Sequence, residues 1–468
     1  MFYRLPDYIA LRSWSDVQRA YYVRNQIDAR PLSQKQFEVM LLCDGEHDIS
    51  LDSTVLQLEA LKLIMPCDKG EYSSQWSSYR KYDNKYFPKM NLMITGKCNY
   101  NCLHCFNAAD NAPIMTEWSF EDIVKLLDQC VECGINAFTI TGGEPMAHKH
   151  FLDILTEIHK RNMFVAEINT NGFYITQDIL DKIKAIGCRP HMKISFDGVG
   201  HHDYMRNFKG AEEIALNAMK LCVDNGFDVM SQTQVHRKNL DSMLETAKLL
   251  ESIGVYKMRI IRTTETPRWA QNAPDASLPI EEYYDSMLEL IRQYIKSDMH
   301  MILTIWQFAQ IHPKSHDYVM EPVYTPAGTY RGSKPVCKGS RAMIAVTSSG
   351  EIVPCNQVSG VLKDLNISMG NLHDKKLKEL ISGGTYLERV CQTVADLKEN
   401  SSKCGSCKYF VNCTGGCRAM GLLYSGKNMD FNAPDITKCY FFENGWHKKL
   451  LEALEGWTNL SPMDTEII

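Results

Sequence analysis

The sequence predicts an α/β protein built on a partial (β/α)6 TIM-like barrel, with a winged-helix-like module before it and a cysteine-rich domain after it. Three observations carry this prediction. Strand and helix patterns alternate through residues 88–310, residues 1–85 follow a different pattern, and clustered cysteines fill residues 330–445 before a terminal helix and tail at 446–468. A chain of 468 residues is long enough for such a division into domains.

The first 85 residues combine short strands with two helices. Residues 7–25 alternate apolar and polar positions around a turn, which is typical of two paired strands. Ser33 is a favourable N-cap for a helix that ends near Gly45, and residues 53–64 have the period of a second helix. This order predicts the winged-helix-like module, and the polar, aromatic segment 75–89 is interpreted as a linker.

The barrel prediction comes from repeats of about 30 residues, which indicate a parallel sheet with right-handed crossovers. The expected strands are 91–95, 137–141, 164–169, 191–196, 227–235 and 256–261, and the expected helices are 119–132, 150–161, 176–186, 210–225, 240–253 and 280–296. Residues 312–335 are rich in Pro, Tyr and Gly and are expected to form a loop, and a last helix is expected at 441–455. In such folds, functional side chains gather at the carboxyl ends of the strands.

Composition narrows the class of protein. A net charge of −5 argues against a general nucleic-acid binder. The sequence shows neither a signal peptide nor an apolar run of about 20 residues, so we expect a cytoplasmic protein without a membrane partner. In that compartment, cysteines at tight spacing indicate metal binding rather than disulfides. Seven of the 17 cysteines are interpreted as buried packing residues: Cys43, Cys67, Cys130, Cys133, Cys188, Cys222 and Cys391.

Three further cysteines lie directly after the first predicted barrel strand. Cys98, Cys102 and Cys105 are spaced C-x-x-x-C-x-x-C. Three thiolates can bind three irons of a cubane and leave the fourth iron open, whereas a structural zinc site would need a fourth ligand, and none is nearby. Polar residues follow the next strands: Gly142, Gly143, Glu144 and Pro145, then Thr170 and Asn171, then Ser195 and Asp197, and finally Arg206.

In this order the segments resemble the radical S-adenosylmethionine (SAM) superfamily. The resemblance implies that SAM chelates the open iron and is cleaved by one electron to a 5′-deoxyadenosyl radical, which abstracts hydrogen. It also implies that Glu144, within the turn of residues 142–145, binds the methionyl amino group, Ser195 the ribose and Arg206 the carboxylate. His104 replaces the family's usual aromatic residue and can still pack against adenine.

Simpler alternatives stay open for these residues. The Gly-Gly-Glu-Pro segment can be a plain turn, and Ser195 and Arg206 can cap a helix or form a surface pair. We expect His201 and His202 to be loop residues rather than ligands.

The remaining cysteines lie in the C-terminal third: Cys337, Cys355, Cys404, Cys407, Cys413, Cys417 and Cys439. Two closed zinc sites would need eight cysteines, so seven disfavour a pair of zinc ribbons. The pattern resembles the SPASM extension, which holds two auxiliary clusters. The resemblance implies one cluster on Cys404, Cys407, Cys413 and Cys439, and another on Cys337, Cys355 and Cys417 whose fourth site is open or closed by Cys391. The cofactors expected are therefore SAM and three [4Fe–4S] clusters.

The same resemblance points to a peptide substrate. SPASM relatives form thioethers or C–C crosslinks, epimerise residues, or mature sulfatases; the last group carries an Asp where Asn356 stands here. The N-terminal module resembles the leader-recognition domain of ribosomal peptide maturases, although it can equally be a structural cap. We expect thioether formation on a precursor peptide with a leader, with flavodoxin or ferredoxin as reductant. The alternatives are the other peptide modifications, a multi-cluster electron carrier and a zinc-binding module.

Overall fold

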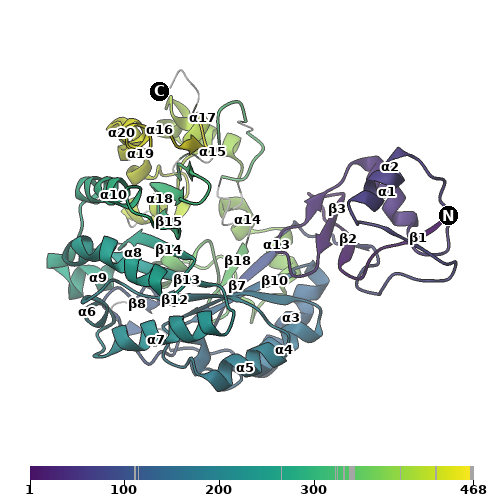
Figure 1. Cartoon of the computed structure of the whole chain (residues 1–468), viewed down its shortest axis with the longest axis horizontal. Coiled ribbons are helices and arrows are strands. Elements are labelled where there is room, and N and C mark those ends of the chain that lie inside the picture. The colour runs from purple at the N-terminus through teal and green to yellow at the C-terminus, as the bar shows by residue number, and fades with distance from the viewer. Residues whose placement is uncertain are drawn as a thin grey trace.

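A computed structural model describes residues 1–109, 112–113, 115–264, 266–321, 323, 325–329, 332–336, 343–390, 392–426 and 430–463. Figure 1 shows an N-terminal module projecting to one side of a larger body, in which a sheet with outer helices lies beneath a group of short C-terminal helices. Among the described residues, no helix combines the length and apolar character that a bilayer crossing requires.

Six parallel strands form the centre of the body, as the sequence predicts. They are β7 (Lys89–Thr95), β10 (Ala137–Gly142), β11 (Phe164–Thr170), β12 (His191–Ser195), β13 (Val229–Val235) and β14 (Lys257–Arg262). The helices between them are α3 (Phe120–Cys133), α4 (Phe151–Lys160), α5 (Gln177–Ala185), α6 (His202–Arg206), α7 (Ala211–Asp224) and α8 (Met243–Ser252). The fold is therefore mixed α/β with a large, mostly parallel sheet.

The sheet extends beyond these six strands to twelve, in the order β19-β18-β7-β10-β11-β12-β13-β14-β15-β16-β17-β20. After α9 (Pro267–Asn272) and α10 (Ile280–Tyr294), β15 (Ile302–Ile305) adds in parallel to β14, followed by antiparallel β16 (Ala309–His312) and β17 (Asp317–Val319). The expectation of a loop at 312–335 is thus wrong at its start. On the other edge, β18 (Met343–Val346) runs parallel to β7 and pairs with β19 (Ile352–Val353).

The two faces of the sheet differ in polarity. On β14, Met258 and Ile260 are fully buried and belong to the main hydrophobic core, whereas Lys257 and Arg259 are half-buried. Because successive side chains of a strand point to opposite faces, Lys257 and Arg259 lie on the inner face, away from the outer helices. The inner face of β14 is consequently polar at these positions.

The N-terminal module has its own core and a four-stranded sheet in the order β4-β3-β2-β6. Its elements are β1 (Phe2–Arg4), β2 (Ile9–Ser13), β3 (Ala20–Val23), β4 (Arg30–Pro31), α1 (Gln34–Leu42), α2 (Ser53–Ala60), β5 (Met65–Cys67) and β6 (Arg80–Lys81). Ser33 caps α1 in a capping box with Gln36, as predicted. The expected linker 75–89 contains β6, so part of it belongs to the module.

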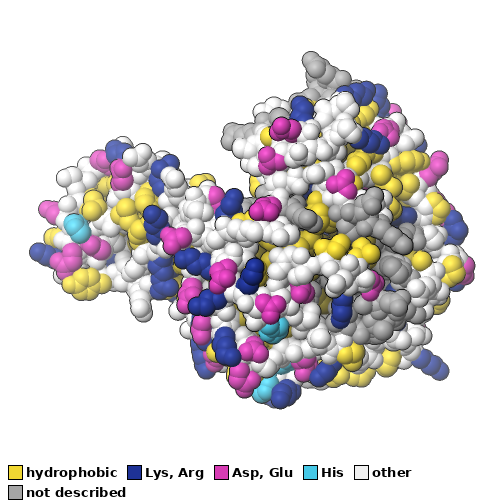
Figure 2. Space-filling model, turned by 180° about the vertical axis from the view of Figure 1, so that it is seen from behind, with side chains coloured by type: hydrophobic (Ala, Val, Ile, Leu, Met, Phe, Trp, Pro, Cys, Tyr) yellow, Lys and Arg dark blue, Asp and Glu magenta, His cyan; other side chains and the backbone are white. Residues whose placement is uncertain are grey.

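Two aromatic side chains join this module to the barrel. The indole of Trp14 donates to the carbonyl of Cys133 at 3.2 Å, and the hydroxyl of Tyr22 donates to the carbonyl of Gly134 at 3.2 Å. Both carbonyls lie at the end of α3, where Gly134 adopts φ +73° and a Cβ would approach the Trp14 and Tyr82 rings within 3 Å. Figure 2 shows from behind that the module meets the body over a narrow region, with Lys and Arg side chains gathered beside it. The module is therefore anchored at the side of the barrel.

The C-terminal region consists of short helices: α12 (Ser359–Asp364), α13 (Leu377–Ser382), α14 (Thr385–Val390), α15 (Val394–Asn400), α16 (Ser402–Gly405), α17 (Phe410–Cys413), α18 (Arg418–Tyr424), α19 (Ile436–Glu443) and α20 (Trp446–Ala453). The single helix expected at 441–455 is replaced by α19 and α20. Gly445, at φ +70°, separates them, because that backbone conformation ends a right-handed helix.

Candidate functional site

The loop after β7 carries Cys98, Cys102 and Cys105, and neighbouring elements fix its backbone. The Leu103 amide donates to the carbonyl of Met205 at 3.0 Å, and Nε of Arg268 donates to the carbonyl of Cys102 at 2.9 Å. Burial raises the pKa of Cys98 to about 12 and of Cys105 to about 11. A bound metal centre would be needed to deprotonate these thiols at neutral pH, and three thiolates in one loop suit a cubane with an open iron.

The two glycines after β10 let this loop pack closely against the barrel. The Gly143 amide donates to the carbonyl of Thr95 at 2.8 Å, and the Glu144 amide donates to that of Lys97 at 2.9 Å. A Cβ on Gly142 would lie 2.3 Å from the carbonyl oxygen of Thr95, and one on Gly143 would lie 2.3 Å from that of Lys97. Both contacts involve backbone, so neither could be relieved by moving a side chain. The glycines are required by the approach of the cysteine loop, not only by a turn.

We therefore expect Gly143→Ala to displace the cysteine loop. The added methyl group would collide with two carbonyl oxygens, those of Lys97 and Gly96 at 2.3 and 2.5 Å. The measurement is iron and sulfide content after anaerobic reconstitution, with a loss of about four irons per chain expected if one cubane fails to assemble. Gly383→Ala is the matched control, because a Cβ at that position would have no atom within 4 Å. Equal iron content in both variants would contradict the packing argument.

Glu144 is fully buried and accepts three hydrogen bonds from protein donors. Its Oε1 accepts from the Thr170 hydroxyl at 2.9 Å and the Met146 amide at 3.2 Å, and its Oε2 accepts from the Asn171 amide at 2.8 Å. Burial raises the pKa of Glu144 to about 7, against the lowering effect of these donors. The carboxylate thus links the ends of β10 and β11 and retains lone pairs for a cationic group. The side-chain amide of Asn171 in turn donates to Oδ1 of Asn99, in the cysteine loop, at 2.9 Å.

Asp197 and Arg206 form a buried ion pair after β12. Nε of Arg206 lies 2.7 Å from Oδ2 of Asp197 and Nη2 lies 3.1 Å from Oδ1, while Nη1 points to the sulfur of Cys102 at 3.8 Å. Asp197 also accepts from the Gln234 amide at 2.9 Å, and it is fully buried. Asp197 therefore lies behind Arg206 and orients its guanidinium toward the cysteine loop. The alternative of a surface pair for Arg206 is wrong.

His202 does not belong to a loop, which corrects the expectation for this residue. It begins α6, is fully buried, and its Nδ1 accepts from the Asp197 amide at 2.9 Å and lies 3.2 Å from Oδ2 of Asp197. An Nδ1 that accepts a hydrogen bond leaves the proton of the neutral ring on Nε2. His201 precedes α6 as its N-cap residue, without a side-chain cap.

Sequence reasoning missed three residues that border the same site. His236 follows β13 and Trp269 lies on α9, with ring centroids 5.6 Å apart, and Arg268 contacts the cysteine loop. The position of His236 after a parallel strand is a signal that could have found it. Within the described residues, Nδ1 of His104 and Nε2 of His236 are buried without a hydrogen-bond partner, as is Nε1 of Trp269. Burial lowers the pKa of His104 to about 3, so its ring stays neutral. These orphaned polar atoms fit the polar edges of a bound nucleoside.

A second site lies among the C-terminal helices. Cys404, Cys407, Cys413 and Cys439 line one pocket, together with Phe442 and other residues. Burial raises the pKa of Cys413 to about 12 and of Cys439 to about 11. No three His, Cys, Asp or Glu residues of the described ranges converge on a point suited to a single metal ion. Four cysteines around one pocket match the set expected for the first auxiliary cluster.

The other auxiliary set is only partly described. Cys355 precedes a short helical turn and Cys417 caps α18, whereas Cys337 and Cys391 lie outside the described residues. Asp435 links this set to the first one. Its Oδ2 accepts from the Cys417 amide at 2.8 Å, and its Oδ1 caps α19, the helix that carries Cys439.

Comparisons with known proteins agree with this geometry. Residues 92–250 match the radical SAM superfamily, and residues 337–414 match the SPASM iron–sulfur cluster-binding domain. The chain carries a radical SAM domain and a SPASM domain. It is a radical SAM enzyme, with SAM and iron–sulfur clusters as cofactors.

Three similar proteins illustrate the range of relatives. An AdoMet-dependent heme synthase of Oleidesulfovibrio alaskensis is 26% identical over 72% of this chain and 84% of its own length. The subtilosin biosynthesis protein AlbA of Bacillus subtilis is 24% identical over 70% of this chain and 66% of its own length. The crystal structure of Streptococcus suis SuiB bound to precursor peptide SuiA shares the fold, with 13% identity, a TM-score of 0.66, and coverage of 94% of this chain and 100% of SuiB.

Proposed function

We propose that this radical SAM enzyme is a maturase of a ribosomally made precursor peptide, and that it forms a thioether from a substrate cysteine. The observation that carries the proposal is the N-terminal module: a small domain with its own core and sheet, joined to the barrel by Trp14 and Tyr22. Its strand and helix order suits a winged-helix-like leader-binding domain, in which a peptide adds to a sheet edge. The shared fold with SuiB, which was solved with its precursor peptide, supports this interpretation, as does the similarity to AlbA.

The residues at the carboxyl ends of the strands would hold SAM beside the first cluster. When bound, the cluster and SAM supply a 5′-deoxyadenosyl radical that abstracts hydrogen. Glu144 would accept from the methionyl ammonium group, and Arg206 would bind the carboxylate with the nitrogen that Asp197 leaves available. Ser195 at the end of β12 would meet the ribose, with Thr170 and Asn171 supporting Glu144 and His104 packing on the adenine.

The raised pKa of Glu144 predicts a pH dependence of SAM binding. An ammonium group favours the ionised carboxylate, and burial holds the pKa of Glu144 at about 7 without SAM. Binding therefore releases a proton below pH 7, so affinity should rise about tenfold per pH unit toward neutrality and level off above it. In Glu144→Gln the affinity should fall and this slope should vanish. The measurement is the equilibrium affinity of the reconstituted enzyme for SAM between about pH 5.5 and 8, the range over which Glu144 ionises.

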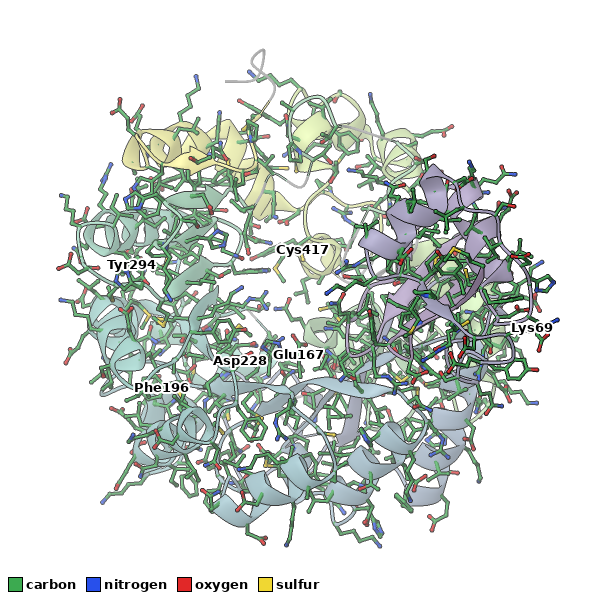
Figure 3. All side chains as sticks on the ribbon, turned by 45° about the vertical axis from the view of Figure 1, so that its right-hand side comes forward. Lys69, Glu167, Phe196, Asp228, Tyr294 and Cys417 are labelled. Carbon is green, nitrogen blue, oxygen red and sulfur yellow. The ribbon has the colours of Figure 1, made fainter. Side chains whose placement is uncertain are left out.

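The auxiliary sites would hold two further clusters, three in all. Cys404, Cys407, Cys413 and Cys439 would ligate one completely, and Cys337, Cys355 and Cys417 would leave an iron of the other open to a substrate thiolate. A metal-bound thiolate stays deprotonated at neutral pH, which suits sulfur as the partner in thioether formation. Figure 3 shows Cys417 facing the interior between the sheet and the C-terminal helices.

Asn356 argues against sulfatase maturation. Its amide Nδ2 donates to Oδ1 of Asn91 on β7 at 3.1 Å, and its Oδ1 is buried without a hydrogen-bond partner among the described residues. An amide cannot accept a proton as a carboxylate does, so this position lacks the base expected of a sulfatase-maturating enzyme.

The decisive test uses mass spectrometry. The anaerobically reconstituted enzyme, SAM and a flavodoxin or ferredoxin reductant are incubated with precursor peptides encoded beside the enzyme. Loss of two hydrogens with consumption of one free cysteine supports a thioether. The same loss with the thiol intact assigns a C–C crosslink, and one solvent deuterium without other mass change assigns epimerisation. Conversion of an iron tetrapyrrole in place of any peptide would overturn the proposal in favour of the chemistry named for the heme synthase relatives.

A further inference from the structure

A layer of polar side chains crosses the barrel interior at the level of the cofactor site. Ser195 on β12 pairs with Gln232 on β13, which pairs with Arg259 on β14. Paired residues of adjoining parallel strands share a face, and neighbouring strands lie about 4.8 Å apart. The Cα of Arg259 is therefore about 10 Å from that of Ser195, on the same inner face.

Positive charge exceeds negative charge beneath this layer. Glu167 on β11 binds Lys89 at 3.0 Å and Lys193 at 2.7 Å, which occupies both lysines. Among the described residues, the ammonium group of Lys257 makes a single, long hydrogen bond of 3.4 Å to the amide oxygen of Gln310, and the more distant carboxylate of Glu321 favours its charged form. Figure 3 shows Glu167 at the edge of the interior, across from Cys417.

The charge state of these groups is set by their mutual contacts. Burial alone would raise the pKa of Glu167, but Lys193 and Lys89 hold it at about 2, so this carboxylate stays ionised. Burial lowers the pKa of Lys193 and of Lys257, and the guanidinium of Arg259 lowers both further. The cations of the interior thus repel one another, and Glu167 is already shared by two of them.

Arg259 stands apart in this set. It is half-buried, and among the described residues it makes no hydrogen bond or ion pair. No nitrogen of this guanidinium is among the buried atoms that lack a hydrogen-bond partner, so the group is accessible in the interior, and its planar fork matches a carboxylate. Its charge and its donors therefore suit an anion that arrives with the substrate.

We propose that Arg259 binds the side-chain carboxylate of an Asp or Glu in the substrate peptide, next to the residue that is modified. This inference rests on the proposed function, because it names the peptide feature that the barrel recognises. Arg259 on β14 is two strands away from Ser195 on β12, with Gln232 on β13 between them, so a carboxylate bound by Arg259 lies close to the residue that would meet the ribose. Backbone and side-chain carbons of the same peptide segment are then brought to the strand ends where the cofactor site lies.

Two pools of short synthetic peptides, amidated at their C-termini, test this recognition. They are identical except that Asn and Gln replace every Asp and Glu in the second pool. Peptides retained by the immobilised, anaerobically reconstituted enzyme with SAM are counted by mass spectrometry. We expect about tenfold greater retention of the acidic pool, the size of one charge-assisted hydrogen-bonded contact.

Variants assign the preference to Arg259. Arg259→Gln should reduce the ratio of retained pools to about one, and Arg259→Lys should keep part of it, because the ammonium group is charged but cannot bind bidentately. Arg292→Gln is the matched control: Arg292 lies on α10, is half-exposed, and faces Glu289 at 3.7 Å. Iron content and the thermal unfolding midpoint confirm that each variant is folded and loaded.

Equal retention of both pools by the unaltered enzyme, or an undiminished preference in Arg259→Gln, would overturn the inference. The pool that contains Asn and Gln is also tested with free C-termini. If Arg259 retains these peptides only in that form, the site binds a terminal carboxylate, and the inference is overturned. Retention of a propionate-bearing tetrapyrrole instead of acidic peptides would do the same. SAM-dependent mass changes in the peptides are scored separately, so the maturase proposal stands or fails on its own readout.

Discussion

Joint replacement of Cys98, Cys102 and Cys105 by alanine should abolish the formation of 5′-deoxyadenosine from SAM. These cysteines lie in one loop after β7, and no other of the six central strands is followed directly by a cysteine at its carboxyl end. Without the cluster that this loop would hold, SAM has neither its chelating iron nor its electron. Anaerobic assay with dithionite and chromatographic detection of the nucleoside gives the measurement.

The control removes cysteines that lie away from the strand ends. Cys130 and Cys133 lie on α3, are buried at 0% and 1% exposure, and belong to the hydrophobic core. Their joint replacement by alanine should leave iron content and 5′-deoxyadenosine formation unchanged. The triple variant should lose about one-third of the iron if three cubanes are present. Continued nucleoside formation in the triple variant would remove the radical SAM site from this loop.

Much of the first site could be predicted because parallel strands bring their carboxyl ends together. Cys98 follows β7, Glu144 follows β10, Asn171 follows β11 and Asp197 follows β12, so strand order alone places them side by side. Local patterns also identified the Ser33 cap and the packing role of Cys130.

Long-range pairings could not be predicted in the same way. β18 pairs with β7, which lies far earlier in the chain, and Met343 stands opposite Lys89. The sequence of a short apolar strand does not indicate which distant strand it will pair with. The contact of Arg268 with the cysteine loop could not be predicted either, because α9 is short and only the tertiary fold brings it to that loop. His202 was expected in a loop, whereas it begins α6 and is buried together with its partner Asp197, which local sequence does not reveal.

Arg206→Met should lower the free energy of unfolding by about 3–5 kcal/mol at neutral pH, because it leaves the carboxylate of Asp197 buried and unpaired. Burial alone would raise the pKa of Asp197, but the guanidinium of Arg206 holds it well below its usual range. A depressed folded pKa contributes stability above the unfolded value of about 3.9, which is lost as pH falls through the folded pKa. In Arg206→Met the pKa of Asp197 rises, so the stability difference between the two proteins should shrink as pH falls from about 7 toward 4. Urea unfolding under anaerobic conditions at several pH values gives these free energies.

The double variant Asp197→Asn with Arg206→Met separates the structural role of the pair from its role at the cofactor. Removing both charges leaves no buried ion of this pair uncompensated, so most of the stability lost in Arg206→Met should return. SAM binding should nevertheless stay weak, because the guanidinium that faces Cys102 at 3.8 Å is absent in both variants. If Arg206→Met lowers the free energy of unfolding by less than about 1 kcal/mol, the contribution of an exposed ion pair, then the Asp197–Arg206 pair does not stabilise the fold as a buried ion pair should. Recovery of SAM binding together with stability in the double variant would show that Arg206 acts only by holding α6 in place, and the cofactor carboxylate would then need another partner.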